Sequence, residues 1–366
     1  KLPLIEAGMA ITAKGREIVG EYKRYLRETY EARIVYGDTD SVMSKFDHLS
    51  GKSWKEKQTF WNRVNDELSQ IFDGIVLELE KVMLIINFAP KMYAYMCYDE
   101  AGNLPHDPGK IVSKGIVLAR RDGVPWVRDR YRDILYNILS NYSRDYYQQA
   151  ESMKKSFNLI VDAALELEEN RVNWEELAKI NEMGSNYKNP NYPMAVLGHH
   201  LRQIGRPCQP GDRLRYLICN IPGQTSVGRK MRTDDEYLES QDSDNPLKPD
   251  VNYYLEDALL KKVDPLFQVG YNKILPYMTG VGYNPRSRRR YVGVDNPVKM
   301  LARMIEDGED IRSKKEWFRE EADNMVANLG KEENEKQEEN KVRVVIRRVE
   351  TKKSPQRNRE RPLCLD

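Results

Sequence analysis

Residues 36–41, which read Tyr-Gly-Asp-Thr-Asp-Ser, constrain the local fold more than any other stretch of the chain. They separate two β-patterned runs, 33–36 and 42–46, and therefore predict a β-hairpin with a polar tip. The carboxylates of Asp38 and Asp40 are two residues apart, so we expect them to share one pocket at this tip. Their repulsion would favour protonation of one of them, and a divalent cation that prefers hard oxygen ligands removes that penalty. The pattern thus predicts a magnesium site.

This turn has two other interpretations. Gly, Asp and Ser are ordinary turn residues, so the segment can be an Asp-rich hairpin turn without a ligand. A calcium loop is the second alternative, and it requires Gly at its sixth position and Glu at its twelfth. Counted from Asp38, these positions hold Met43 and Leu49, which excludes the calcium loop.

The bulk composition narrows the class of protein. A chain of 366 residues can hold two domains, and a net charge of +2 means that any nucleic-acid surface must come from local clusters of charge. The cysteines lack zinc-ligand spacing and are too sparse for a disulfide framework, which favours an intracellular, reducing compartment; they are Cys97, Cys208, Cys219 and Cys364. No apolar run is long enough to span a membrane, so we expect no membrane partner. Because Lys1 is neither an initiator Met nor part of a signal peptide, we expect a piece of a longer protein.

The first third of the chain predicts an α+β fold. Apolar residues recur at helical spacing in 12–29 and 53–72, which predicts one helix before and one helix after the hairpin at 33–46. Further strands are expected within 75–98 and 110–121. Helices and antiparallel strands in separate runs are typical of this class.

The pattern becomes mostly helical beyond about residue 125. The expected elements are helices beginning at 127 and covering 150–170, 174–182 and 253–269, a strand at 214–221 and a polar loop at 223–249. Residues 341–361 hold nine Lys or Arg against two Glu and few apolar residues, which predicts a mobile tail. We therefore expect domains at 1–125 and 126–300, and a charged, mobile tail at 301–366.

The hairpin sequence resembles the third catalytic motif of family B DNA polymerases, in which this turn holds the metals for nucleotidyl transfer. Two more segments of the first domain support the resemblance. Residues 10–16 are similar to the Ile-Thr-x-x-Gly-Arg stretch of that family. Pro90-Lys91-Met92-Tyr93 is similar to its Lys-Lys-x-Tyr primer motif, with Pro90 in place of the first Lys. That replacement puts one DNA contact in doubt.

The resemblance continues at separated points to about residue 270. The matching segments are Glu78-Leu79-Glu80-Lys81 ahead of the primer motif, Lys114-Gly115 with Arg120-Arg121-Asp122 at the end of the palm, Gly211-Asp212-Arg213 with Tyr216 in the thumb, and Asp250 with Tyr253-Tyr254 at a thumb helix. A basic cluster, Arg286 and Arg288 to Arg290, follows the matched region and suits a DNA backbone or a solvated loop.

The resemblance implies a catalytic site for template-directed DNA synthesis by two-metal nucleotidyl transfer. Asp38 and Asp40 would be the catalytic and metal-binding residues, with Asp40 as the direct ligand of one of two Mg²⁺ ions. The turn and its surroundings would be supported by Tyr36, Gly37, Thr39, Ser41 and Glu80. The primer and template DNA would be bound by Lys91, Tyr93, Lys114, Arg120, Arg121 and Arg213.

The resemblance also implies an architecture and partners. Residues 1–125 would form the C-terminal part of an antiparallel palm sheet with helices, and 126–300 a mostly helical thumb. The palm strand with the other metal-binding Asp and the nucleotide-gripping fingers helix have no match here. We therefore expect the N-terminal part of the polymerase as a partner, beside the DNA primer–template, dNTPs and a processivity factor, and no activity of this fragment alone. The expected location is the nucleus or a viral replication site.

Two other functional classes remain open. The chain can be a non-catalytic DNA-binding scaffold or subunit derived from a family B polymerase, although the intact Asp38 and Asp40 argue against a decayed copy. A reverse transcriptase fits less well, because its hairpin carries two adjacent Asp. The resemblance implies Cys clusters in the tails of the cellular nuclear replicases, and since no such cluster stands near this C-terminus, we expect a viral or other cluster-free member of family B.

Overall fold

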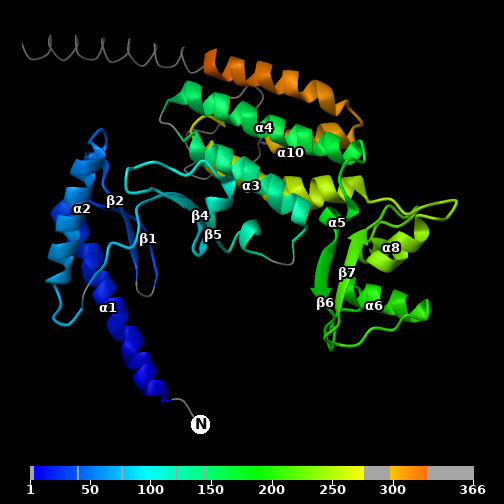
Figure 1. Ribbon diagram of the computed structural model, residues 1–366, viewed down its shortest axis with the longest axis horizontal. Coiled ribbons are helices and arrows are strands. Elements are labelled where there is room, and N and C mark those ends of the chain that lie inside the picture. The colour runs from blue at the N-terminus through cyan, green and yellow to red at the C-terminus, as the bar shows by residue number, and fades with distance from the viewer. Residues whose placement is uncertain are drawn as a thin grey trace, which may run out of the picture. The chain divides into compact units, whose positions relative to one another are not determined.

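The computed structural model describes residues 4–38, 41–75, 77–120, 123–142, 145–275 and 297–327. The chain divides into two compact units, residues 1–120 and residues 121–366, and each is described separately. Helices and small antiparallel sheets make both units, which confirms the α+β class (Figure 1).

The first unit is built on two helices and a hairpin. Helix α1, Ile5–Tyr30, ends at Glu31, whose left-handed backbone (φ 52°) turns the chain into strand β1, Arg33–Gly37. Strand β2, Val42–Lys45, returns antiparallel to β1, as the sequence predicts. Helix α2, Trp54–Ser69, begins at a capping box in which Ser53 and Glu56 satisfy each other's backbone N–H groups.

One hydrophobic cluster fixes these elements against each other. Its buried members are Tyr22 and Leu26 of α1, Ala32 before β1, and Val64 and Leu68 of α2. Because the second half of α1 runs beside the hairpin while its first half does not, Leu4, Ile5, Met9 and Ile11 remain exposed.

A second, three-stranded sheet completes the first unit. It consists of β3, Met83–Ala89, β4, Met92–Cys97, and β5, Val112–Lys114, with β4 in the centre and both pairings antiparallel. Three short 3₁₀ turns connect the parts of this unit: Asp47–Leu49, Pro108–Lys110 and Val117–Ala119. The strand expected at 110–121 is thus confined to three residues.

Helices dominate the second unit. Helix α3, Pro125–Ser140, and helix α4, Tyr146–Glu168, lie side by side (Figure 1). They pack against a rare π-helix, Tyr253–Leu260, in which the backbone N–H of Lys261 reaches back five residues to Glu256. This segment continues directly into helix α9, Lys261–Gly270.

A small sheet with short helices forms the rest of this unit (Figure 1). Its antiparallel strands are β6, Lys179–Glu182, β7, Arg213–Ile218, and β8, Met231–Thr233, in that order. The accompanying helices are α5, Trp174–Leu177, α6, Pro193–Gln203, α7, Val227–Lys230, and α8, Asp234–Ser240.

Two sequence-based assignments in this sheet are wrong. The helix expected at 174–182 ends at Leu177, and the next residues form β6, because hydrogen bonding to β7 outweighs local helical spacing. The loop expected at 223–249 contains α7, β8 and α8, and α8 starts at a capping box formed by Thr233 and Glu236.

Residues 297–327 differ from the mobile tail expected to begin at 301. Helix α10, Pro297–Glu306, is followed by a 3₁₀ turn, Ile311–Ser313, and by a helical stretch at 314–327. Phe318, Ala322 and Met325 recur at helical spacing and are fully buried, and the Phe318 ring stacks on Phe157 of α4 at 3.9 Å between centroids. An apolar stripe within a charged composition therefore anchors this stretch. The tail residues 328–366 and the basic cluster at 286–290 lie outside the described residues.

Within the described ranges, no helix has both the length and the apolar character required to cross a membrane.

Candidate functional site

The β1–β2 turn presents Asp38 at its tip. Tyr36 pairs with Met43 and Gly37 with Val42, and a β-bulge lies between Ile34 and Tyr36. The backbone N–H of Asp38 donates to the carbonyl of Ser41 at 3.1 Å, which closes the turn. The predicted hairpin is therefore confirmed, while the two residues between these, Thr39 and Asp40, lie outside the described residues.

Gly37 leaves space for a lysine of α1. A Cβ atom at this position would lie 2.6 Å from both Cε and Nζ of Lys23, and 3.2 Å from the Ser41 carbonyl oxygen. Any larger residue here would have to displace the Lys23 side chain. The glycine thus allows one cationic side chain to lie against the backbone next to Asp38.

The Asp38 carboxylate is 42% exposed and has contacts with Tyr36 and Lys91. The Tyr36 hydroxyl donates to Oδ2 at 3.3 Å, and Lys91 Nζ lies 3.6 Å from the same oxygen. Tyr36 and Asp38 are two residues apart, so an extended backbone places both side chains on one face of the hairpin. The structure thus brings three of the predicted site residues together.

Lys91 owes its position to the turn between β3 and β4. Ala89 pairs with Met92, so Pro90 and Lys91 form a two-residue loop. Lys91 has a φ of 62°, and Pro followed by a left-handed residue is the pattern of a type II turn. Pro90, which stands where the family motif has a Lys, therefore fixes the turn that projects Lys91.

Gly115 packs under this same turn. Its φ is +65°, and a Cβ atom there would lie 2.3 Å from the carbonyl oxygen of Lys91. The residue before Gly115, Lys114 of β5, pairs with Tyr93 of β4. The segments 90–93 and 114–115, which the sequence separates by more than twenty residues, therefore form one structural feature.

Three tyrosine rings run from the hairpin into the three-stranded sheet. The Tyr36 and Tyr93 centroids are 5.3 Å apart with the planes tilted by 50°, and Tyr93 and Tyr95 stack at 6.2 Å with 25° between planes. Burial raises the pKa of Tyr93, and the neighbouring Tyr36 adds to that rise. Lys81 Nζ lies 5.5 Å from the centroid of the Tyr95 ring and 3.4 Å from its hydroxyl.

Sequence reasoning named Lys81 only as the end of the matched segment 78–81 and missed Tyr95, because their contact depends on the antiparallel pairing of β3 with β4. Glu80, expected to support the site, pairs with the Lys81 ammonium. Glu80 is largely exposed, and this pair joins two neighbours in the chain. Lys114 is exposed at the end of β5, and Arg120 ends the described part of the first unit. Arg121 lies outside the described residues.

Arg213 belongs to the second unit. It is exposed at the first position of β7, where its register partner is Glu182. The preceding Gly211 has a φ of +97°, and its N–H donates to the Met183 carbonyl at 2.8 Å. The glycine therefore shapes the turn from which Arg213 projects.

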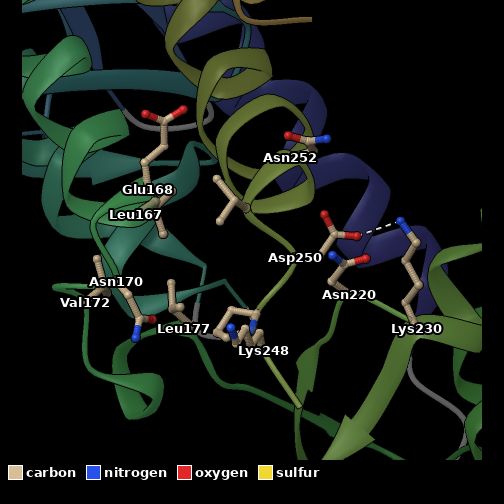
Figure 2. Close-up of a pocket in the computed structure, with 12 residues that line it drawn as sticks. Leu167, Glu168, Asn170, Val172, Leu177, Asn220, Lys230, Lys248, Asp250 and Asn252 are labelled. Carbon is tan, nitrogen blue, oxygen red and sulfur yellow. Dashed lines mark hydrogen bonds and ion pairs between the residues drawn. The ribbon is translucent and has the colours of Figure 1, made fainter. Parts of the chain in front are cut away.

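Asp250 and Tyr254 of the thumb-like segment stabilise the second unit. Asp250 is 5% exposed, accepts from the Tyr253 N–H at 3.1 Å through Oδ1, and pairs with Lys230 Nζ at 2.6 Å through Oδ2. The buried Tyr254 hydroxyl accepts from the Ile218 N–H at 3.0 Å. Asp250 also lines a cavity of about 400 Å³ between the end of α4 and the start of this helical segment (Figure 2).

The histidines upstream have a structural environment. His200 Nε2 lies 2.6 Å from Glu236 Oε1, and the other oxygen of Glu236 belongs to the cap of α8. His199 is exposed on the same helix.

The donor chemistry of the turn suits a hard cation. Asp38 supplies an accessible carboxylate, although the residues that the structure describes contain no group of three His, Cys, Asp or Glu side chains able to hold a metal. The described part of the turn therefore offers part of a ligand set. Asp40 would be its second carboxylate.

Comparison with known proteins defines the family. Residues 1–269 match the model of DNA polymerase family B. The chain is 27% identical over 300 residues to the DNA polymerase delta catalytic subunit of Candida albicans, with 76% of this chain and 26% of that protein covered. It is 25% identical over 339 residues to DNA polymerase 037L of Invertebrate iridescent virus 6, with 73% and 26% covered.

A solved structure, the family B DNA polymerase from the hyperthermophilic archaeon Pyrobaculum calidifontis, is similar with a TM-score of 0.49 and 18% identity, over 70% of this chain and 29% of that chain. The present chain spans about a quarter of the length of these relatives. Since the family model covers nearly three quarters of the sequence, including the aspartate turn and the Pro-Lys-Met-Tyr segment, the chain belongs to DNA polymerase family B.

Proposed function

We propose that this chain contributes part of the palm active site and the thumb to a DNA-directed DNA polymerase. The observation that carries the proposal is the convergence on Asp38: the hairpin presents its carboxylate, and the β3–β4 turn brings Lys91 to within 3.6 Å of it. A carboxylate and a primer-binding lysine side by side suit a reaction in which a primer end meets a metal-bound nucleotide.

Asp38 and Asp40 would hold the magnesium ions, with Asp40 as the direct ligand. When bound, the two ions would lower the pKa of the primer 3′-hydroxyl and stabilise the pyrophosphate leaving group. The chain's own residues would keep the carboxylates at the tip of a short hairpin, with Ser41 closing the turn and Gly37 leaving it compact.

DNA would be held by cationic residues of both units. Lys91 would orient the primer end, and Tyr93, Lys114, Arg120 and Arg121 would extend that surface along the first unit. Arg213, exposed at the start of β7, would contact the duplex from the second unit. Contacts of this kind act on phosphates and give affinity without sequence readout.

A complementary N-terminal part of the polymerase would complete the site with the other metal-binding carboxylate and the nucleotide-gripping helix. A processivity factor is a further proposed partner. We therefore expect that the purified chain binds primer–template DNA without extending it. Extension of a labelled primer by the isolated chain would contradict this division of the active site.

A non-catalytic DNA-binding role is the second candidate. It is favoured by the described residues' lack of a three-ligand metal group. The two functions differ in what the aspartates do. In a scaffold, neutralising Asp38 or Asp40 would leave the biological activity intact.

The deciding experiment uses the complete polymerase that contains this chain. Asp40→Asn should reduce single-nucleotide incorporation by about three orders of magnitude or more while leaving DNA affinity nearly unchanged, since it removes a metal ligand and no DNA contact. Asp47→Asn is the matched control, because Asp47 follows the same hairpin and pairs with Lys45 at its other end. Near-normal incorporation by Asp40→Asn would support the scaffold.

A further inference from the structure

We propose that the three tyrosines Tyr36, Tyr93 and Tyr95, here called the tyrosine column, orient the Asp38 carboxylate. Tyr36 is the positioning residue that contacts Asp38, and Tyr93 acts on Asp38 through the Tyr36 ring rather than through its own hydroxyl. The inference deepens the proposed function, because it concerns the same carboxylate turn. It also gives Tyr93 a role other than a contact to DNA.

The first step is the control of Asp38 by Tyr36. The Asp38 side chain is almost half exposed at a hairpin tip, where a hydrogen-bond donor favours one rotamer over the others. The Tyr36 hydroxyl donates to Oδ2 at 3.3 Å from the same face of the strand. Lys91 reaches the same oxygen, but its side chain is 75% exposed and flexible, and such a pair selects a rotamer weakly.

The second step is the control of Tyr36 by Tyr93. The Tyr36 ring lies against that of Tyr93, with 5.3 Å between centroids and a tilt of 50°. Tyr93 belongs to the central strand of its sheet, where Asn87 on one side and Lys114 on the other fix its backbone. A ring on a doubly paired strand is a firmer support than a hairpin tip.

The third step is the base of the column. Tyr95 is only 7% exposed and stacks against Tyr93 at 6.2 Å. Lys81 lies over the Tyr95 ring at 5.5 Å, a distance at which a cation is attracted to an aromatic face. The column thus runs from a buried, cation-capped ring to an exposed carboxylate.

This arrangement couples two segments that the sequence places 57 residues apart. A displacement of β4 would move the Tyr93 ring, and this would shift the Tyr36 hydroxyl. The direction of the Asp38 oxygens would change as a result. Hydrogen-bond partners of metal-binding carboxylates commonly affect cation affinity about tenfold or more. We therefore expect the column to influence how the turn binds a divalent or trivalent cation.

The test separates the Tyr93 ring from its hydroxyl in the purified 366-residue chain. The χ1 rotamer populations of Asp38 are measured from three-bond NMR couplings after selective isotope labelling. Wild type and Tyr93→Phe should each show one dominant Asp38 rotamer. Tyr36→Phe, which removes the hydroxyl, and Tyr93→Ala, which removes the supporting ring, should both show averaged couplings.

The second measurement is the affinity of the chain for Tb³⁺, which is titrated alone and followed by its tyrosine-sensitised luminescence. Tyr93→Ala should weaken Tb³⁺ binding roughly tenfold, and Tyr93→Phe should change it less than twofold. Tyr98→Ala is the matched control, because it removes a tyrosine of the same unit whose ring lies against Trp54, with 5.3 Å between centroids. Tyr93→Leu, which keeps most of the apolar volume, replaces Tyr93→Ala if that variant does not fold.

The proposal is overturned if Tyr93→Ala or Tyr93→Leu keeps the wild-type Asp38 couplings, or if Tyr93→Phe averages them as much as Tyr93→Ala does. The second result would assign the effect to the Tyr93 hydroxyl. Neither readout requires polymerase activity, so a failure of the proposed function would leave the rotamer result intact. Conversely, if the tyrosine column does not orient Asp38, Asp40→Asn still tests catalysis separately.

Discussion

Tyr36 in the first unit and Tyr271 in the second use the same hydroxyl group in opposite ways. The Tyr36 hydroxyl donates at 3.3 Å to the carboxylate of Asp38, a side chain that is 42% exposed. The Tyr271 hydroxyl is buried and lies within 3.0 Å of the hydroxyls of Ser152 and Ser156 and of the Ser152 carbonyl. Asn137 donates to both serines and completes this set.

The difference indicates which polar groups are accessible to a ligand. In the cluster around Tyr271 the polar groups bond to one another, so they link α3 and α4 to the turn after α9 and have little capacity for a ligand. In the first unit, by contrast, the Asp38 carboxylate is partly exposed at a turn. A buried cluster whose members bond to one another stabilises a fold, whereas a solvent-exposed carboxylate is accessible to a ligand.

The largest expected effect tests whether residues 314–327 belong to the core of the second unit. Phe318→Ala should lower the free energy of unfolding by about 3–5 kcal/mol, because it removes a fully buried ring stacked on Phe157. Leu79→Ala in the first unit, where the side chain is 43% exposed, should cost about 0.5 kcal/mol or less. Urea unfolding followed by circular dichroism measures both. A loss below about 1 kcal/mol for Phe318→Ala would mean that residues 314–327 add little to the core.

The second prediction uses the pH dependence of stability to test the buried cluster around Tyr271. Burial raises the pKa of Tyr271 from 10.0 to about 12, so the folded chain holds this proton more tightly than the unfolded chain does. The resulting stability is complete below pH 10 and is lost as the pH rises toward 12, by roughly 3 kcal/mol. The advantage of wild type over Tyr271→Phe in unfolding free energy should shrink over this window. A constant difference between pH 9 and 12 would contradict the assignment.

The third prediction compares the two hydroxyls directly at neutral pH. Tyr271→Phe should destabilise the chain by about 1–3 kcal/mol, because it removes a buried hydroxyl that bonds to Ser152 and Ser156. Tyr36→Phe should change stability by about 0.5 kcal/mol or less, since water can replace the lost donor. Denaturant unfolding of both variants gives the answer. Equal losses would remove the distinction between a saturated and an open site.

The smallest expected effect concerns the open site alone. Lys91→Met removes an ammonium that lies 3.6 Å from Asp38 and repels an incoming cation. Binding of Mn²⁺ to the chain should therefore tighten by about two- to threefold, which matches the weak free energy of an exposed ion pair. Arg63→Met serves as the control, because Arg63 pairs with Glu67 on α2 at 3.8 Å. Weaker Mn²⁺ binding after Lys91→Met would show that the lysine supports the cation.

Local signals predicted much of the fold. The carboxylate hairpin follows from alternation interrupted by Gly and Asp, and the start of α2 follows from Ser53 and its capping partner. The pattern failed at 174–182, where Trp174, Leu177 and Ile180 keep helical spacing although residues from Lys179 onward pair with β7. It also failed at 314–327, because the charged composition concealed an apolar stripe.

The candidate site was predictable only in its parts. Single motifs identified Asp38, Lys91 and Tyr93 from their residue types. Their convergence depends on β-sheet register and on the fit of Gly115 beneath Lys91, and neither is encoded within one short segment. Tyr95 belongs to no motif, and Lys81 belongs to a matched segment that gives it no role, so only the folded sheet reveals that they stand behind Tyr93.

The π-helix at Tyr253–Leu260 has a consequence for length variation. Its i→i+5 hydrogen bonding accommodates an extra residue without changing the phase of the helix on either side. Deleting one residue within this segment should therefore restore regular α-helix and keep Val263, Leu266 and Phe267 facing the core. Deleting one residue from α4 would instead rotate its buried face by about 100°. The π-helix is thus a position in the second unit where the chain can lose a residue while its packing is preserved.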